Sequence, residues 1–297
     1  MTDDAVAICL MSEKDFEDVV ELDKICFNRS DRPRSTENIA ALHQNHPKGC
    51  FVAKNTDLQA IGYLFTKILG DVAYIGPLGV LPQWQGKGIG KLLIQRAVTC
   101  LVDAGCKTIG LEARADAIGN IGLYLSMGFR PVMPTVMFRP KATLFSNFSD
   151  ELLNINDISV KKIDDFCEKL RTSSGIDLWP DLDTCCRNGY DNIFFTARNG
   201  ELNGFFAYTP LIYPHGWGGF LPDFSCTSFA ALYENAVRVN DGRTFSVRAN
   251  YRYANLHQLL GGHFEVEMCL IRMLLRDFAG DFDAIATSSI ILRSWVS

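Results

Sequence analysis

The stretch Gln85-Gly86-Lys87-Gly88-Ile89-Gly90 decides the fold, because it joins an apolar extended run, Ala73 to Leu81, to an amphipathic helix. The first backbone N–H groups of a helix have no intrahelical partner, and the helix dipole is positive there. The sequence therefore predicts a loop that binds a diphosphate through its main chain, with glycines that let the ligand approach closely. Apolar residues recur at helical spacing after the loop, at Ile89, Leu92, Leu93, Ala97, Leu101 and Ala104, and Gly105 ends the pattern.

The glycine spacing separates this loop from two other phosphate loops. A Rossmann turn reads G-x-G-x-x-G and a P-loop places Lys-Ser/Thr after its last glycine, and neither pattern fits. The pattern Gln-x-x-Gly-x-Gly resembles the acetyl-CoA pyrophosphate loop of the GCN5-related N-acetyltransferases (GNAT). The resemblance implies that acetyl-CoA, which leaves as CoA, contacts the loop and the strand before it, at Leu78, Gly79, Val80, Gln85, Gly86, Lys87, Gly88, Ile89, Gly90 and Lys91.

A second motif of the same family lies downstream, from Leu111 to Phe129. It reads as a strand ending in Leu-Glu-x-Arg and a helix carrying Leu-Tyr-x-x-x-Gly-Phe, and it most resembles the subgroup that acetylates ribosomal-protein N-termini. In that subgroup a glutamate and a tyrosine are separated as Glu112 and Tyr124 are here. One residue departs from the pattern: the asparagine usually found seven residues before the tyrosine is Ala117, and Asn120 is displaced by one helical turn.

Transfer of an acetyl group from a thioester to an amine needs a base for the amine and an acid for the departing thiolate. A lysine-like ammonium with a pKa of about 10.4 has no lone pair, so a base must take its proton, directly or through water. Glu112 is the candidate base and Tyr124 the candidate acid. Each residue also has a purely structural interpretation. Glu112 could be an exposed strand carboxylate paired with Arg114 or solvent, and Tyr124 could be a core tyrosine.

The strand before the loop carries its own signal, because Gly76, Pro77 and Gly79 interrupt the apolar run. Glycine and proline inside a strand favour a β-bulge. In the family such a bulge splays two parallel strands and admits the pantetheine arm. The resemblance also implies that the main chain of Leu78 and Val80 pairs with pantetheine, and that a backbone N–H near Val80 polarises the thioester carbonyl.

The composition indicates the cellular compartment and the classes of partner to expect. With 297 residues, 47% of them hydrophobic, the chain is long enough for two domains of about 150 residues each. The first sixteen residues show no secretory signal and no apolar run could cross a bilayer, so we expect a soluble, cytoplasmic protein with reduced cysteines. The net charge of −5 argues against nucleic-acid binding and mildly favours a cationic acceptor. His43-x-x-His46 offers too few ligands for a metal.

The two halves of the chain resemble each other, which indicates a tandem acetyltransferase. We expect an α/β (α+β layered) fold with two GNAT-like domains, residues 1–145 and 146–297, each a mixed central sheet flanked by helices. The second copy has Ser225–Ala230 in place of the glycine loop, and Phe229 and Ala230 would obstruct a diphosphate, so no cofactor is expected there. The repeated segments are Ile61–Leu64 and Asn203–Phe206, Leu78–Pro82 and Gly218–Pro222, Glu112–Asp116 and Ser246–Asn250, and Gly128-Phe129 and Gly262-His263-Phe264.

The sequence indicates little about the identity of the acceptor. In this fold the first helix–loop–helix lines the acceptor site, here Asn28 to Gly49, whose charges, Arg32 and Arg34 among them, could bind a carboxylate-bearing acceptor or be solvated. The leading hypothesis is an acetyl-CoA-dependent N-acetyltransferase that moves the acetyl group directly to a primary amine of a small molecule or a protein N-terminus. The alternative is a non-catalytic acyl-CoA-binding sensor or scaffold. A homodimer is left open, and neither a nucleic acid nor a membrane is expected as a partner.

Overall fold

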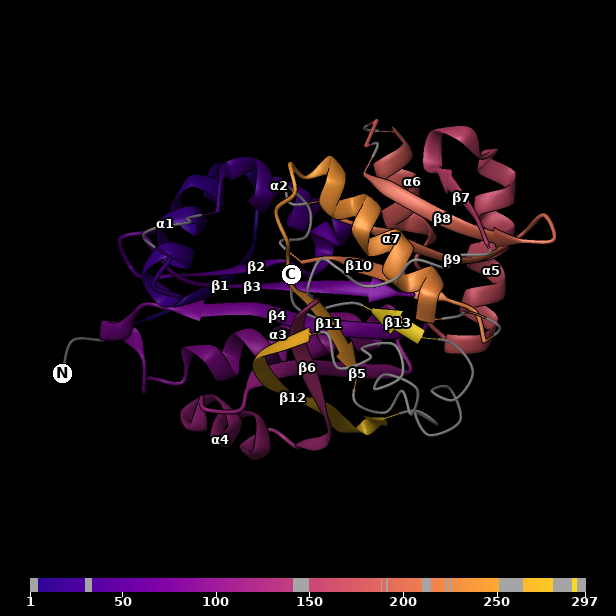
Figure 1. The fold of residues 1–297 in the computed structure, drawn as a ribbon. Coiled ribbons are helices and arrows are strands. Elements are labelled where there is room, and N and C mark those ends of the chain that lie inside the picture. Colours follow the sequence, from indigo (N-terminus) through magenta and orange to yellow (C-terminus); the bar gives the residue numbers. More distant parts are fainter. Residues whose placement is uncertain are drawn as a thin grey trace.

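Two β-sheets with helices packed on their faces form the protein (Figure 1). The computed structural model describes residues 5–29, 34–140, 150–187, 189–190, 192–209, 215–222, 224, 226–250, 264–279 and 290–292. Strands and helices alternate along most of this chain, which confirms the expected α/β class.

The elements are as follows along the chain. The larger sheet contains β1 (Ala7–Leu10), β2 (Phe51–Lys54), β3 (Ala60–Leu69), β4 (Val72–Val80), β5 (Thr108–Arg114), β6 (Phe129–Pro140), β11 (Val247–Asn250) and β12 (Phe264–Ala279). The smaller sheet contains β7 (Glu151–Asn154), β8 (Ile193–Arg198), β9 (Glu201–Ala207), β10 (Trp217–Phe220) and β13 (Ile290–Leu292). The helices are α1 (Phe16–Cys26), α2 (Thr36–Asn45), α3 (Ile89–Asp103), α4 (Ile118–Ser126), α5 (Val160–Ser174), α6 (Trp179–Arg187) and α7 (Cys226–Val239). Short 3-10 turns are η1 (Glu13–Asp15), η2 (Pro47–Gly49), η3 (Pro82–Trp84) and η4 (Ile155–Asp157).

Helices cover both faces of the larger sheet, whose strand order is β1-β2-β3-β4-β5-β12-β6-β11. Figure 1 shows α1 and α2 above this sheet and α3 and α4 below it. Side chains alternate between the two faces along each strand. In β3, Leu64 joins the core under α3, whereas Tyr63 and Phe65 join the core under α1 and α2. Both faces are therefore buried, as the near-continuous apolar pattern of β3 and β4 requires.

A bulge in β4 opens the sheet beside the glycine loop. The register between β3 and β4 shifts from Thr66↔Ile75 to Leu64↔Leu78, so Gly76 and Pro77 together oppose one residue of β3. This confirms the predicted bulge. Strand β4 pairs in parallel with β5 only over Val72–Tyr74, opposite Thr108–Gly110. Beyond that point the described parts of the two strands are unpaired, which is the predicted splay.

The smaller sheet, in the order β13-β10-β9-β8-β7, also has a helical layer on each face. Phe195 and Phe205 pack with α5 and α6, and their ring centroids are 5.5 Å apart. Their strand neighbours Phe194 and Phe206 point to the other face and pack under α7. Aromatic side chains thus fill both cores of the second half of the chain.

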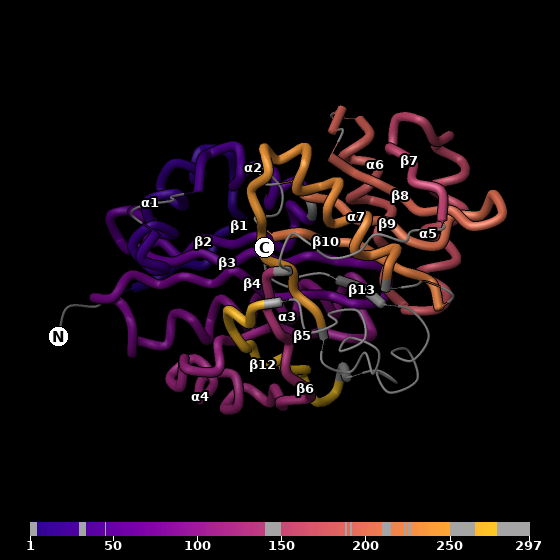
Figure 2. The backbone as a smooth tube through the Cα atoms, viewed as in Figure 1, coloured from indigo at the N-terminus to yellow at the C-terminus, as the bar shows by residue number. Residues whose placement is uncertain are grey.

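Strands from the second half complete the first sheet. β12 lies between β5 and β6: Arg272 pairs with Glu112 of β5 on one side and with Met133 of β6 on the other. β11 pairs with the outer edge of β6. Figure 2 shows the yellow backbone of β12 running among the purple strands of the N-terminal half. The division at residues 145 and 146 remains a proposal, and strands on its far side belong to the larger sheet.

Two further expectations can be compared with the described residues. The nine cysteines whose side chains are described are all free thiols, and the reduced state stays a prediction. In the described part of the chain, no helix has both the length and the apolar character that crossing a bilayer requires.

Candidate active site

The glycine loop connects η3 to α3 and is open to solvent. Gly86 and Gly88 have left-handed backbone conformations, with φ of 76° and 82°, which favour glycine. A Cβ at either position would meet nothing within 4 Å, so the space before the backbone is clear. Gly88 is the N-cap of α3 and no side chain caps this helix. The first N–H groups of α3 are therefore directed at a space that an anion can enter.

Two loop side chains hold the loop in place. The amide Nε2 of Gln85 donates a hydrogen bond of 2.9 Å to the backbone oxygen of Val80. The ammonium of Lys87 lies 4.4 Å from the ring centroid of Trp84, within cation–π range. Gln85, predicted to contact cofactor, thus fastens the loop to the end of β4.

The other predicted contact residues on α3 and β4 differ in exposure. Lys91 is exposed, whereas Ile89 is buried in the core under α3. A Cβ at Gly90 would lie 3.5 Å from Leu123 of α4, an ordinary contact distance, so this position has room for one. A Cβ at Gly79 would lie 2.7 Å from a buried tyrosine ring of β3, so this position must be glycine. Ile89 and Gly79 therefore shape the site through packing.

The main chain of β4 faces the gap beside β5. Leu81 donates its N–H to the oxygen of Ile61 at 3.0 Å, so this N–H points toward β3. Because N–H groups alternate along a strand, those of Leu78 and Val80 point to the opposite edge, where β5 has diverged. An extended amide-containing chain can pair with this edge as an added strand.

Tyr124 lies on α4, below the sheet. Its ring packs edge to face on Phe129, with centroids 6.1 Å apart, and it borders the core under α3. Burial raises the pKa of Tyr124 to about 12, so the phenol keeps its proton at neutral pH. Ala117 is the N-cap of α4 and provides no capping side chain, and Asn120 is exposed.

The carboxylate of Glu112 is buried and ion-paired. Arg272 of β12 donates to its Oε1 from Nη2 at 2.8 Å and from Nε at 3.2 Å, and Thr135 of β6 donates to the same atom at 2.7 Å. Oε2 lies 3.9 Å from Nη1 of Arg248 and accepts no hydrogen bond from the described residues. The alternative pairing with Arg114 is wrong, because that side chain is bonded to Asp116 at 2.6 Å.

Sequence reasoning missed the three partners of Glu112. Thr135, Arg248 and Arg272 come from β6, β11 and β12, and only the insertion of β12 into the larger sheet brings them to β5. One signal was available: Arg272 interrupts an apolar strand pattern from Cys269 to Leu275. A single charge in such a run must find a buried partner.

A second buried carboxylate lies at the end of α1. Asp23 is fully buried, and its Oδ1 accepts a hydrogen bond of 2.5 Å from the hydroxyl of Tyr63. Oδ2 lies 3.5 Å from Nε of Arg29 and 3.5 Å from Nε of Arg34. Both arginines lie within Asn28 to Gly49, the segment that was expected to line the acceptor site, and Arg32 falls outside the described residues.

The helix of the second half that corresponds to α3 begins in a different environment. Near the start of α7, Ser228 donates to the carboxylate of Asp150 at 2.6 Å, and Arg198 pairs with the same carboxylate at 2.8 Å. Phe229 is buried in the core under α7, and Ala230 is also buried. A negative side chain, not a pair of apolar ones, distinguishes this end from the loop of the first half.

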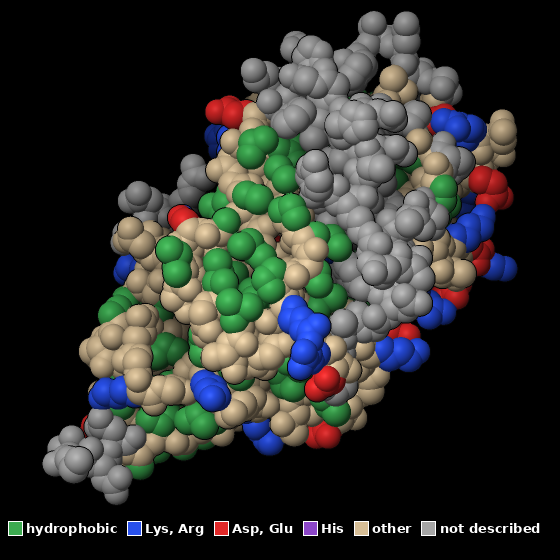
Figure 3. All heavy atoms as spheres, turned by 90° about the horizontal axis from the view of Figure 1, so that it is seen from below, with side chains coloured by type: hydrophobic (Ala, Val, Ile, Leu, Met, Phe, Trp, Pro, Cys, Tyr) green, Lys and Arg blue, Asp and Glu red, His purple; other side chains and the backbone are tan. Residues whose placement is uncertain are grey.

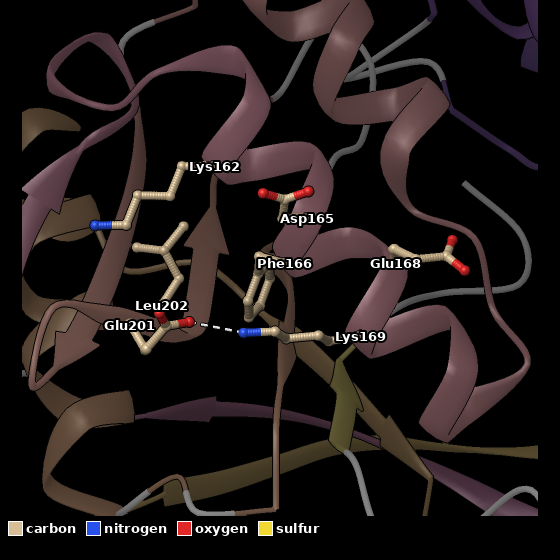
Figure 4. A pocket seen from close by; sticks show the side chains of 7 residues that line it. All are labelled: Lys162, Asp165, Phe166, Glu168, Lys169, Glu201 and Leu202. Carbon is tan, nitrogen blue, oxygen red and sulfur yellow. Dashed lines mark hydrogen bonds and ion pairs between the residues drawn. The ribbon is translucent and has the colours of Figure 1, made fainter.

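Two other surface features lie apart from these residues. A pocket of about 350 Å³ between α5 and β9 is lined by Lys162, Asp165, Phe166, Glu168, Lys169, Glu201 and Leu202. Figure 4 shows Lys169 of α5 reaching to Glu201 of β9, with which it pairs at 2.7 Å. Figure 3 looks onto the α3 and α4 side, where apolar side chains gather. Exposed ones on these helices include Leu92, Ile118 and Leu125.

Comparison with known proteins identifies relatives of the first half. Residues 16–129 match the model of the acetyltransferase (GNAT) family. The chain is 32% identical over 88 residues to N-alpha-acetyltransferase MAK3 of Arabidopsis thaliana, covering 28% of this chain and 45% of the relative. It is 30% identical over 103 residues to mycothiol acetyltransferase of Paenarthrobacter aurescens, covering 32% of this chain and 31% of the relative. The matched segments thus span less than half of either relative.

The complete architecture also has a counterpart among solved structures. A putative acetyltransferase from Pyrococcus horikoshii superposes with a TM-score of 0.69, covering 95% of this chain and 93% of that one. The sequences are 17% identical, so the likeness shows the fold alone. It extends over both halves of the chain.

Proposed function

Because residues 16–129 belong to the acetyltransferase (GNAT) family, we propose that this chain is an acetyl-CoA-dependent N-acetyltransferase acting in its N-terminal half. The observation that carries the proposal is the clear space before Gly86 and Gly88, at the uncapped start of α3 and beside the open edge of β4. A diphosphate fits the clear space at the start of α3, and a pantetheine arm fits the open edge of β4. Residues 146–297 would then be a degenerate copy that binds no cofactor.

In direct transfer, the acetyl group passes from the thioester to the amine in one step, and the residues of the site have separate roles. Bound acetyl-CoA supplies an activated acetyl group, whose C–S bond breaks as the C–N bond to the amine forms. The N–H of Val80 polarises the carbonyl from the edge of β4. The Oε2 side of Glu112 takes the proton that the ammonium must lose, through water. Tyr124 gives a proton to the departing sulfur, and solvent returns to it the proton that the acylated nitrogen releases.

Calorimetry with acetyl-CoA on the full chain tests the binding half of the proposal. We expect one site per chain, abolished in Gly88→Trp because the indole fills the space before the loop. Gly200→Trp is the matched control: Gly200 lies in the turn between β8 and β9, has φ of 80° and also has nothing within 4 Å. Absence of binding to the wild type, or equal loss in both variants, would overturn the loop assignment.

Turnover tests the catalytic half. Release of CoA with a panel of primary amines should fall in Glu112→Gln and in Tyr124→Phe while acetyl-CoA binding persists. Binding without turnover on any amine would favour an acyl-CoA sensor. One relative is named an N-alpha-acetyltransferase and the other a mycothiol acetyltransferase, so their names leave the acceptor open.

A further inference from the structure

Two side chains from the strands beyond β5 hold the carboxylate of Glu112. Arg272 is its direct neighbour on β12, and Thr135 lies one strand further, on β6. Leu111 and Met273, which also pair across β5 and β12, both belong to the core under α3. Because side chains alternate along a strand, Glu112 and Arg272 point to the opposite face of the larger sheet.

The hydrogen bonds from Thr135 and Arg272 meet at one oxygen of this carboxylate. Oε1 accepts from Oγ1 of Thr135 at 2.7 Å, from Nη2 of Arg272 at 2.8 Å and from Nε of Arg272 at 3.2 Å. A carboxylate oxygen has about two lone-pair sites, so Oε1 is fully occupied. Oε2 is buried and accepts no hydrogen bond from the described residues, and Nη1 of Arg248 lies 3.9 Å from it. The lone pairs that remain to take a proton are therefore those of Oε2.

The position of Glu112 along β5 gives this free oxygen a use. Glu112 lies two residues beyond Gly110, the last residue of β5 that pairs with β4, so it lies where the two strands have separated. A buried oxygen without a partner costs free energy, which a water or an acceptor nitrogen at Oε2 would recover. Rotation of the carboxyl group would exchange its two oxygens, and the bonds to Oε1 oppose that rotation.

We propose that Thr135 and Arg272 are positioning residues, which hold Glu112 so that Oε2 accepts the proton of the acceptor amine. The inference rests on the proposed function, in which Glu112 takes that proton through water. Neither residue touches a substrate, and each acts through Glu112. Because Arg272 lies on β12, the second half of the chain then supplies part of the active site of the first half.

Thr135→Val tests the inference, since it removes the hydroxyl bonded to Oε1 and keeps nearly the same side-chain shape. CoA release is measured at pH 7 with spermidine, glucosamine and a tetrapeptide beginning with alanine, and kcat and KM are determined for the fastest acceptor. We expect kcat to fall roughly tenfold to a hundredfold, because a small displacement of a reacting group has an effect of that size. KM for acetyl-CoA should not change, since the lost bond contacts neither substrate. Thr135→Ser restores the hydroxyl and should restore kcat.

Thr196→Val is the matched control. Thr196 is as fully buried as Thr135, and its hydroxyl donates to the backbone oxygen of Gly204 at 3.4 Å in the smaller sheet. We expect this variant to keep the kcat of the wild type. Arg272→Lys provides a second test, because it keeps the buried positive charge and loses the guanidinium fork that gives two bonds to Oε1. Its kcat should fall while acetyl-CoA still binds.

Three results would overturn the inference: a wild-type kcat in Thr135→Val, equal losses of kcat in Thr135→Val and Thr196→Val, or no recovery in Thr135→Ser. A rise in KM for acetyl-CoA that accounts for the whole loss would also overturn it. These results leave the proposed function intact. The proposed function fails instead if the wild type binds no acetyl-CoA or acetylates no amine, and the inference then fails with it.

Discussion

Replacing Arg272 by methionine removes the main partner of Glu112 at almost constant volume. The two side chains are 4% and 1% exposed and are joined by bonds of 2.8 and 3.2 Å, so the variant leaves a buried carboxylate with Thr135 as its close donor. Breaking a buried pair from one side costs about 3–5 kcal/mol. We expect Arg272→Met to lower the free energy of unfolding by that amount.

Urea unfolding at pH 7, followed by circular dichroism, measures the loss. Lys169→Met is the control, because it removes an exposed partner of Glu201 and should cost about 0–1 kcal/mol. The double variant Arg272→Met with Glu112→Gln should recover part of the loss, since the buried carboxylate charge is gone, although Arg248 then loses the carboxylate that lay 3.9 Å from it. A cost for Arg272→Met no larger than that of Lys169→Met, or a double variant no better than the single one, would refute the reasoning.

Three further predictions concern the loop, the candidate acid and the inserted strand. Gly88→Ala should lower stability by about 1–2 kcal/mol because of its left-handed backbone, whereas Gly90→Ala, in a helical position with room for a Cβ, should raise it by up to about 1 kcal/mol. Thermal unfolding distinguishes them, and equal shifts would contradict the assignment. Because the folded pKa of Tyr124 is raised to about 12, its contribution to stability is complete below pH 10 and is lost as the pH rises toward 12. In thermal melts the wild type should therefore lose stability relative to Tyr124→Phe over that range, and parallel curves would show an unperturbed phenol. A chain ending after Pro140 lacks β12 and should fail to show cooperative unfolding, while co-expression with residues 150–297 should restore it.

Local sequence patterns predicted those features of the fold that depend on residues close together in the sequence. The helical spacing after Gly88 and the glycines of β4 determine α3, the bulge and the splay through contacts made within about thirty residues of sequence, on the scale of one strand–helix unit. The internal repeat matched Phe129 with Phe264, and in the structure each of these residues begins a strand.

The partner of that strand could not be predicted, because pairing register and exchange between similar sheets leave no trace in local pattern. Phe264 begins a strand that pairs with β6 itself, where the repeat suggested an equivalent position in the second sheet. The environment of Glu112 follows from this exchange. Its role was proposed from a motif, and its arginine partners lie more than a hundred residues away in sequence.

The position of β12 also governs when the protein can fold during translation. Glu112 and Arg272 are 160 residues apart, and ribosomes add about 5–20 residues per second, so β5 waits roughly 8–30 s for its neighbour. Until then β5 and β6 each present an unpaired strand edge, which is a template for aggregation. We therefore expect the nascent N-terminal half to depend on chaperones for longer than a locally paired domain, and slow codons between β6 and β12 should lower the yield of native protein.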